Sequence, residues 1–455
     1  MARHLWTLLR RFLLVFWSVL VCAPRIPAEH THSDFQNAAE KKPYIDSFEV
    51  IWSTLRDRYW DSTMAGLDWQ AIHREYLKKV QAANDPETER SLMMQMMRQL
   101  PSSHLALIPK SVYPAHEAGS AVRNSSSQNQ TDDADGDGVQ DGTTGLTATV
   151  IDGLLVVEAV EKDSAAMQSG VRMGWTIESI DGVPVSDMFR SIRSMKQIEP
   201  PDELMADIVE YSLRGPVGST IQMAFVREDG KQIAYDLVRR PAPGKLVEFG
   251  NLPPEQVCIE HRKLNNGVGY IRLNIFLDAL SVMPEVEKAV REFKDAPAII
   301  LDLRNNPGGV GMIAMGIAGW FVSTEGLELG TMTGRDVYMK FEINPRLDAY
   351  TGRMAVLVNE GSASTSEILA QGLQDLGRAR IFGTKTAGAA LPSSIIELPD
   401  GDRFQYPEAN YVSAKGRVLE GNGVQPDVVV KPTTAALLQG RDLVLEAASE
   451  WGAGK

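Results

Sequence analysis

A short stretch from Ala355 to Glu367 constrains the fold of this chain more than any other. It begins with Ala-Val-Leu-Val, which predicts a β-strand, continues through a turn marked by Gly361, and ends in Ser-Ala-Ser364-Thr-Ser-Glu367, which predicts a helix start. A serine on such a turn is held exposed, and the N–H groups at the helix start point toward a developing oxyanion. Ser364 and Glu367 also fit a capping box, so a nucleophile and a plain helix cap both stay open here.

The first residues are typical of an export signal. Three arginines within the first eleven residues precede an apolar run from Phe12 to Cys22, and Ala28 ends a cleavage site. The run is short for a transmembrane span. We expect residues 1–28 to be a signal peptide and the protein to be exported to the periplasm or the extracellular space. The alternative is an uncleaved signal, which would be the only attachment to a membrane.

The net charge of the chain limits the classes of partner that we expect, and its cysteine content limits the disulfides that it can form. The net charge of the 455-residue chain is −13, and removal of residues 1–28 takes away four arginines and no acid, which gives −17. Such acidity argues against a nucleic-acid partner. Because Cys22 leaves with the signal, Cys258 stands alone and no disulfide framework exists; we expect Cys258 to be a small buried apolar residue.

Residues 34–116 are predicted to form an N-terminal helical domain. Apolar residues recur at spacings of three and four between Tyr44 and Val80, and a methionine-rich segment follows at 87–99. The chain then leaves the last helix through Ser103-His104, in an apolar turn. A lone histidine in such a place is either structural or functional.

Residues 117–144 are predicted to be an acidic, low-complexity linker. Carboxylates stand at positions 1, 3, 5 and 9 of a calcium loop, with glycine at position 6. They are Asp133, Asp135, Asp137 and Asp141. The last position holds Thr144 in place of glutamate, and no helix flanks the loop, so an unliganded linker is favoured over weak structural calcium. No cofactor is expected to be required.

Residues 145–240 carry mostly strand signals and resemble a PDZ domain. The resemblance rests on the run from Val160 to Gly182, which looks like the turn, short helix and strand of that domain. PDZ domains take a peptide as an added strand and hold its carboxylate on backbone N–H groups. The resemblance assigns that role to Gly145, Leu146, Thr147 and Ala148. A purely structural lid is the alternative.

Residues 250–440 alternate strand and helix signals and predict an α/β core. The expected helices include 284–294 and 311–321. After the strand that ends near Arg304 comes Asn305-Asn306-Pro-Gly308-Gly309, whose glycines let backbone N–H groups approach a ligand closely. The predicted fold class is therefore multidomain α/β, with a helical cap, a PDZ-like β-rich domain and an α/β catalytic core.

Three motifs of the core, at 302–309, 361–367 and 420–427, together resemble the C-terminal-processing (tail-specific) serine peptidases. The relatives of that family include the tricorn core protease and the retinoid-binding repeats of the interphotoreceptor protein. The resemblance covers nearly the whole mature chain. It implies Ser364 as nucleophile, and an oxyanion hole formed by the N–H of Thr365 and one N–H from Gly308 or Gly309.

The general base separates two branches of that family. The tail-specific branch uses a lysine in Gly-x-x-Thr-Phe-Gly-Lys, but Ala389 holds its place here, and Lys385 lies about 13 Å away in an extended segment. The tricorn-like branch uses a histidine preceded by serine, which Ser103 and His104 match, and a glutamate, which Glu420 matches. The resemblance then implies His104 as base, with Ser103 and Glu420 orienting the site. Such a base predicts activity that rises through about pH 6 to 7.

We therefore expect an exported serine endopeptidase that acts on unfolded or terminal segments of a peptide or protein substrate. Two alternatives stay open: a catalytically silent ligand- or peptide-binding protein on the same architecture, and a scaffold whose PDZ-like domain tethers partners. Ser364, His104, the glycine pair and Glu420 argue against both, because a binder needs none of them together.

Overall fold

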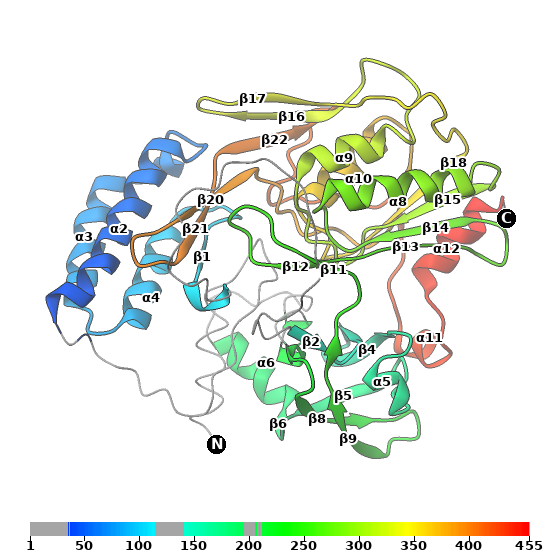
Figure 1. The fold of residues 1–455 in the computed structure, drawn as a ribbon, viewed down its shortest axis with the longest axis horizontal. Helices are drawn as coiled ribbons and strands as arrows, with labels where there is room; N and C mark the ends of the chain where they lie inside the picture. The colour runs from blue at the N-terminus through cyan, green and yellow to red at the C-terminus, as the bar shows by residue number, and fades with distance from the viewer. Residues whose placement is uncertain are drawn as a thin grey trace, which may run out of the picture.

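The computed structural model describes residues 35, 37–113, 141–194, 205–206, 209 and 212–454. The signal peptide and Asp133, Asp135 and Asp137 of the possible calcium loop lie outside these residues. Figure 1 shows three groups of elements: a helical part, a β-rich part and a larger α/β core. Within the described ranges, no helix has both the length and the apolar character needed to cross a bilayer. The mixed α/β, multidomain class expected from the sequence is confirmed.

The helical part consists of α2 (Ala38–Arg58), α3 (Trp69–Ala82) and α4 (Pro86–Met97). Each helix begins after a side chain that caps its first N–H groups: Asn37, Asp68 and Asp85. Their apolar faces share one core, in which the four methionines of α4 are buried. The segment that follows leads through a bend at Ser103-His104 into β1 (Ala106–Ile108).

The α/β core is built on a six-stranded sheet in the order β13-β14-β15-β18-β19-β23. All neighbouring pairs are parallel except β13 with β14. The strands are β13 (Ile259–Lys263), β14 (Gly269–Leu273), β15 (Ala298–Asp302), β18 (Arg353–Val358), β19 (Arg380–Gly383) and β23 (Val428–Val429). Every residue of β15 is buried, as in a strand covered on both faces.

Helices cover both faces of this sheet. The side chains of α8 (Ala279–Glu292), α9 (Gly311–Ala318) and α10 (Thr365–Asp375) join one apolar cluster with Ile299 and Leu301. On the other face, α12 (Leu443–Gly452) packs with Ala298 and Ile300. The loops at the carboxyl ends of β15 and β18 lie at one edge of the sheet, which is where open α/β sheets bind ligands.

Two expectations need correction. The helix predicted for 284–294 begins at Ala279, because Pro284 lies within its second turn instead of opening it. Cys258 is only partly buried, since it precedes β13 at the edge of the sheet, and its thiol lies 3.9 Å from Glu260 Oε1.

Two small antiparallel sheets complete the core, and the sequence did not predict them. One has the order β17-β16-β22, with β16 (Glu328–Gly334), β17 (Tyr338–Glu342) and β22 (Ala409–Ser413). The other has the order β1-β21-β20, with β20 (Ser393–Glu397) and β21 (Arg403–Pro407). Through β1 the helical part is joined to the core, with Ala106 opposite Gln405. Buried Asp402 supports the junction by accepting hydrogen bonds from the Arg90 guanidinium.

The β-rich part holds a five-strand path, β3-β4-β5-β8-β9, with its own apolar cluster. Its strands are β3 (Leu146–Ile151), β4 (Leu154–Val160), β5 (Thr176–Ile180), β6 (Val183–Pro184), β8 (Thr220–Val226) and β9 (Gln232–Val238), and its helices are α5 (Ala165–Gln168) and α6 (Val185–Ser194). Two small antiparallel sheets accompany it. One has the order β10-β2-β7, with β2 (Asp141–Thr143), β7 (Gly215–Pro216) and β10 (Arg240–Pro241), and the other pairs β11 (Lys245–Val247) with β12 (Glu255–Val257). The C-terminal α11 (Thr434–Leu438) touches the β-rich part at Gly174.

Candidate active site

The serine turn, residues 361–367, connects β18 to α10 and holds Ser364 in a strained conformation. Ser364 has φ 52° and ψ −115°, a region that costs a non-glycine residue energy and is found where a nucleophile is presented on a strand-to-helix turn. The Ser364 N–H donates to the carbonyl of Ala389 at 2.8 Å. Two neighbours fix the flanks: the Ser362 hydroxyl donates to Leu303 O at 2.7 Å, and the Ala363 N–H donates to Asn306 O at 3.0 Å.

Glu367 is fully buried beneath this turn. Its Oε2 accepts hydrogen bonds from the N–H groups of Ser364 (3.1 Å) and Ala389 (2.9 Å). Its Oε1 accepts from the Thr386 hydroxyl (2.5 Å) and the Gly388 N–H (2.7 Å). Burial raises the pKa of Glu367 to about 7, although the four donors favour the charged form. The carboxyl therefore ties the serine turn to residues 386–389.

The glycine turn, residues 305–309, faces Ser364 closely. A Cβ built on Gly308 would lie 2.7 Å from Ser364 Cβ and 2.8 Å from the Thr365 nitrogen, so only glycine fits. The Gly308 N–H already donates to Asn306 Oδ1 at 2.9 Å, which leaves Gly309 as the donor that this glycine pair can direct at a ligand. The Thr365 hydroxyl donates to Gly309 O at 2.7 Å and so links the two turns.

Asn306 is a residue whose role the sequence did not reveal. It is fully buried, its amide donates to Leu273 O at 2.8 Å, and its carbonyl accepts from the Ser366 hydroxyl at 2.9 Å. It thereby holds the glycine turn against both the sheet and α10. The available signal was its place in Asn-Asn-Pro-Gly-Gly, where one polar side chain inside a glycine-rich turn must pair with backbone groups.

His104 lies in a buried chain of hydrogen bonds with Ser103 and Glu420. The Ser103 hydroxyl is 2.7 Å from His104 Nδ1 and donates to Glu420 Oε2 at 2.8 Å, while the Ser103 N–H donates to Glu420 Oε1 at 2.7 Å. A hydroxyl has one proton, so when it donates to an ionised Glu420 it must accept from the N–H at Nδ1. The lone pair of His104 then resides on Nε2.

Burial sets the charge state of these groups. His104 is 3% exposed, and burial lowers its pKa to about 4, so the imidazole is neutral at physiological pH. Burial raises the pKa of Glu420, opposed by its hydrogen bonds from Ser103 and Ala390. The expectation that His104 loses its proton through pH 6 to 7 is therefore wrong, because desolvation disfavours the imidazolium.

Residues 389–390 connect the serine turn with the histidine. The Ala389 carbonyl accepts from Ser364, and the next N–H, that of Ala390, donates to Glu420 Oε2 at 3.2 Å. The structure thus brings Ser364, Thr365 and the glycine pair together, and joins them through this segment to Glu420, Ser103 and His104. Lys385 is exposed, whereas Ala389 is buried.

The remaining predicted site residues lie elsewhere. The Gly145 N–H donates to Thr143 Oγ1 at 3.0 Å, and Leu146, Thr147 and Ala148 belong to β3 in the β-rich part. Asp141, the one described aspartate of the possible calcium loop, opens β2. Among the residues that the structure describes, no group of three or more His, Cys, Asp or Glu side chains is arranged to hold a metal ion.

Comparison with known families identifies part of the chain. Residues 267–430 match peptidase family S41, and residues 42–98 match the tricorn protease C1 domain. The first span contains the serine turn, the glycine turn and Glu420, and the second lies within the helical part. The part of the chain that carries both turns and Glu420 is therefore similar to peptidase family S41.

Individual relatives agree with this assignment. A carboxyl-terminal-processing protease of Synechocystis sp. is 27% identical over 425 residues, which cover 93% of this chain and 88% of the relative. The chloroplastic carboxyl-terminal-processing peptidase 3 of Arabidopsis thaliana is 26% identical, with 83% and 67% covered. A probable CtpA-like serine protease of Staphylococcus haemolyticus is 26% identical over 61% of this chain, which spans only 50% of that relative.

Solved structures share the fold at low identity. The photosystem II D1 C-terminal processing protease has a TM-score of 0.54 and 21% identity, with 90% of this chain and 99% of that chain covered. Mature CPAF has a TM-score of 0.59 and 15% identity, with 91% and 97% covered. The chain thus shares the fold of these two solved structures.

Proposed function

We propose that this chain, which matches peptidase family S41 at residues 267–430, is a serine endopeptidase with Ser364 as nucleophile and His104 as general base. The observation that carries the proposal is the buried chain from Glu420 through Ser103 to His104 Nδ1. It supports a neutral imidazole whose Nε2 would accept a proton. A serine hydroxyl needs such a partner, because it is a weak nucleophile at neutral pH.

The reaction would proceed by acyl transfer. Ser364 Oγ attacks the peptide carbonyl and its proton passes to His104 Nε2. The carbonyl oxygen gains negative charge and receives hydrogen bonds from the N–H groups of Gly309 and Thr365. Collapse of the tetrahedral intermediate breaks the C–N bond, and His104 returns its proton to the leaving amine. Water then enters by the same route and releases the acid, restoring Ser364.

A lysine mechanism has weaker support in this chain. The position that a catalytic lysine would take is Ala389, whose methyl side chain offers no base. Lys385 is exposed, and a lysine base needs a pKa lowered strongly by burial. The match of residues 42–98 to a tricorn protease domain favours the histidine alternative.

The substrate would be a peptide or an unfolded protein segment, as the peptidase domain implies. In the β-rich part, β3 lies at the edge of its sheet, so a peptide could pair with it as an added strand. This supports a PDZ-like role for Gly145 and Leu146. Export follows only from the sequence of residues 1–28, and weak calcium binding only from the spacing of the linker aspartates.

Active-site labelling tests the proposal. A fluorophosphonate probe should react with the wild-type protein, and peptide mapping should place the adduct on Ser364. Ser364→Ala should abolish the adduct. Ser394→Ala, which removes a hydroxyl from β20, should label as wild type does. A folded wild-type protein that resists the probe and cleaves no unfolded substrate would support the silent binding protein instead.

A further inference from the structure

Two large apolar side chains are exposed beside the candidate active site. Leu280 is 89% exposed in the first turn of α8, and Met312 is 69% exposed in the first turn of α9. Both helices follow parallel strands of one sheet, so their first turns lie at the same carboxyl edge. Single exposed apolar residues are ordinary, but a contiguous set at a cleft marks a binding surface.

Both residues are tied to the glycine turn. Met312 comes three residues after Gly309. Leu280 comes four residues after Phe276, whose N–H donates to Gly308 O and whose carbonyl accepts from Val310, each at 2.7 Å. The backbone that shapes the glycine turn therefore also places these two side chains.

An apolar line continues along the contact between α8 and α9. Met283 and Pro284 come three and four residues after Leu280, so the three side chains share one side of α8. The methyl carbon of Met283 would lie 3.1 Å from a Cβ built on Gly316, one helical turn beyond Met312. Met283 therefore bridges the two helices directly beyond the exposed pair.

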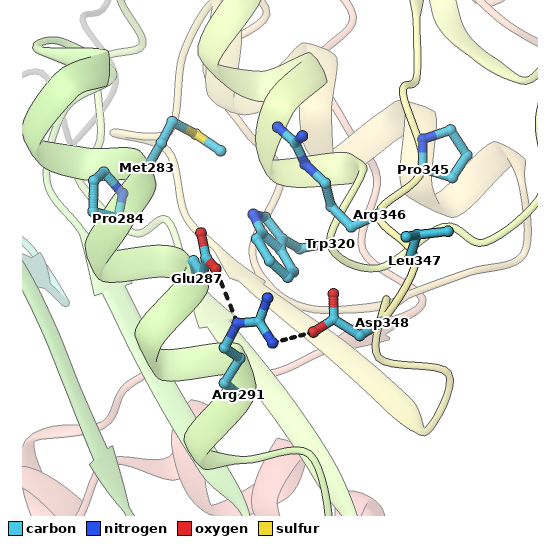
Figure 2. A pocket seen from close by; sticks show the side chains of 9 residues that line it. All are labelled: Met283, Pro284, Glu287, Arg291, Trp320, Pro345, Arg346, Leu347 and Asp348. Carbon is cyan, nitrogen blue, oxygen red and sulfur yellow. Dashed lines mark hydrogen bonds and ion pairs between the residues drawn. The ribbon is translucent and has the colours of Figure 1, made fainter.

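The line ends in a pocket of about 440 Å³, shown in Figure 2. Met283 and Pro284 lie on one side of it, with Trp320, Pro345 and Leu347 across from them. Leu347 is 110% exposed, so its side chain stands clear of the surface. The guanidinium of Arg291 approaches the Trp320 ring to 5.5 Å and that of Arg346 to 5.8 Å, and Arg291 also pairs with Glu287 and Asp348.

We propose that the apolar track, defined as Leu280, Met312, Met283, Pro284 and Leu347, binds an extended apolar segment of the polypeptide substrate next to the bond that is cleaved. This rests on the proposed function. Continuity with the glycine turn identifies the occupant, because a chain held at Ser364 must leave along one of the surfaces around it. From Met312 to the end of α9 at Ala318 the helix rises about 9 Å, the length of roughly three extended residues.

Peptide binding tests the track without catalysis. Two fluorescent peptides share the same central segment. One has four leucine and valine residues on each side of it, and the other has four serine and glutamine residues on each side. Their dissociation constants are measured by anisotropy on Ser364→Ala, which cannot turn the peptides over. The apolar peptide should bind about tenfold or more tightly, the value of one well-buried apolar side chain.

Substitutions in the apolar track test whether the track is the source of the preference for the apolar peptide. Leu280→Ser with Met312→Ser should reduce it to about twofold or less, and Leu347→Ser should reduce it in part. The matched control is Val429→Ser on β23, which is 68% exposed at the far edge of the sheet and should retain the full preference. Circular dichroism and thermal melting show whether each variant is folded.

The outcomes separate the two proposals. A preference that survives the double substitution in a folded protein overturns the track. A second result would also overturn the track. If sedimentation shows a dimer, and the double substitution dissociates it without changing the peptide preference, the surface is occupied by a second copy of the chain. If Ser364 fails to react with fluorophosphonate while the preference is present and is lost in the double variant, the peptidase proposal fails and the track stands.

Discussion

Glu420 holds Ser103 at two points, because one carboxylate oxygen accepts the Ser103 N–H at 2.7 Å and the other accepts its hydroxyl at 2.8 Å. These two hydrogen bonds fix both the backbone that carries His104 and the hydroxyl that contacts the His104 ring. The imidazole is therefore oriented by a hydroxyl that is itself oriented by a carboxylate. In the proposed mechanism, this relay would do the work that a single carboxylate does in a Ser-His-Asp triad.

The first prediction concerns the identity of the base. His104→Ala and Ser364→Ala should each remove nearly all hydrolysis of an unfolded protein substrate, because members of one catalytic unit are non-additive and a single loss can cost on the order of a millionfold. Lys385→Ala, at an exposed position, should stay near wild-type turnover. If Lys385→Ala were inactive while His104→Ala stayed active, the general base would be a lysine and not a histidine.

The second prediction is a pH profile. Burial lowers the pKa of His104 to about 4, so the base stays neutral, and kcat/KM should not fall between pH 7 and pH 6 through this group. Stability should respond differently. The unfolded histidine takes up protons below about pH 6.5 and the folded one only near pH 4, so stability is lost as the pH falls through this window.

Chemical denaturation at pH 7, 6 and 5 checks this linkage. The slope of unfolding free energy against pH should be smaller in His104→Gln than in wild type, because the substituted side chain does not titrate. Equal slopes would show that His104 is not buried in its neutral form. His73→Gln, in the helical part, controls for removing a histidine far from the site.

The third prediction concerns the oxyanion donor. A Cβ on Gly309 would lie 2.4 Å from Phe276 O, at a φ of +127° that L side chains rarely adopt, so Gly309→Ala should displace this N–H. Loss of one such donor typically lowers kcat by about 10² to 10³. Gly326→Ala is the matched control, since Gly326 also has positive φ but nothing lies within 4 Å of its Cβ position. Similar kcat values for the two variants would show that the Gly309 N–H is not an oxyanion donor.

The fourth prediction concerns Glu367. In Glu367→Gln the amide nitrogen must face donors on one side, either Thr386 and Gly388 or Ser364 and Ala389. Leaving such buried groups unpaired costs about 1–3 kcal/mol, so the melting temperature should fall and fluorophosphonate labelling of Ser364 should slow. Glu397→Gln, at an exposed position on β20, should change neither. Unchanged labelling would show that Glu367 does not position the serine turn.

The strands and helices of the core follow local patterns and were largely predictable. The buried run at 298–302 and the turn before Ser364 are each specified within ten or so residues, which periodicity and capping rules cover. Long-range pairings were not predictable in this way. The pairing of Ala106 with Gln405 and the hairpin of β16 and β17 depend on which strands meet in space, and one chain's periodicity does not carry that information.

The roles of individual residues also divide into those that local sequence motifs reveal and those that depend on long-range contacts. Ser364 and the glycine pair stand in recognisable motifs. The His104 segment also stood out by resemblance, but its depressed pKa comes from burial that depends on the docking of the helical part. Asn306 and the four donors to Glu367 are visible only when three loops are seen together.

The junction of β1 with β21 has a consequence for the timing of synthesis. Ser103 and Glu420 are 317 positions apart, so the segment that bears His104 leaves the ribosome long before the strand and the carboxylate that seat it. At typical elongation rates this interval is roughly 15 to 60 seconds. Throughout this interval the nascent chain carries Ser103 and His104 without the Glu420 carboxylate, so under the proposed mechanism its general base is incomplete. Under that mechanism, peptidase activity would begin only after the chain has been made as far as Glu420, between β22 and β23.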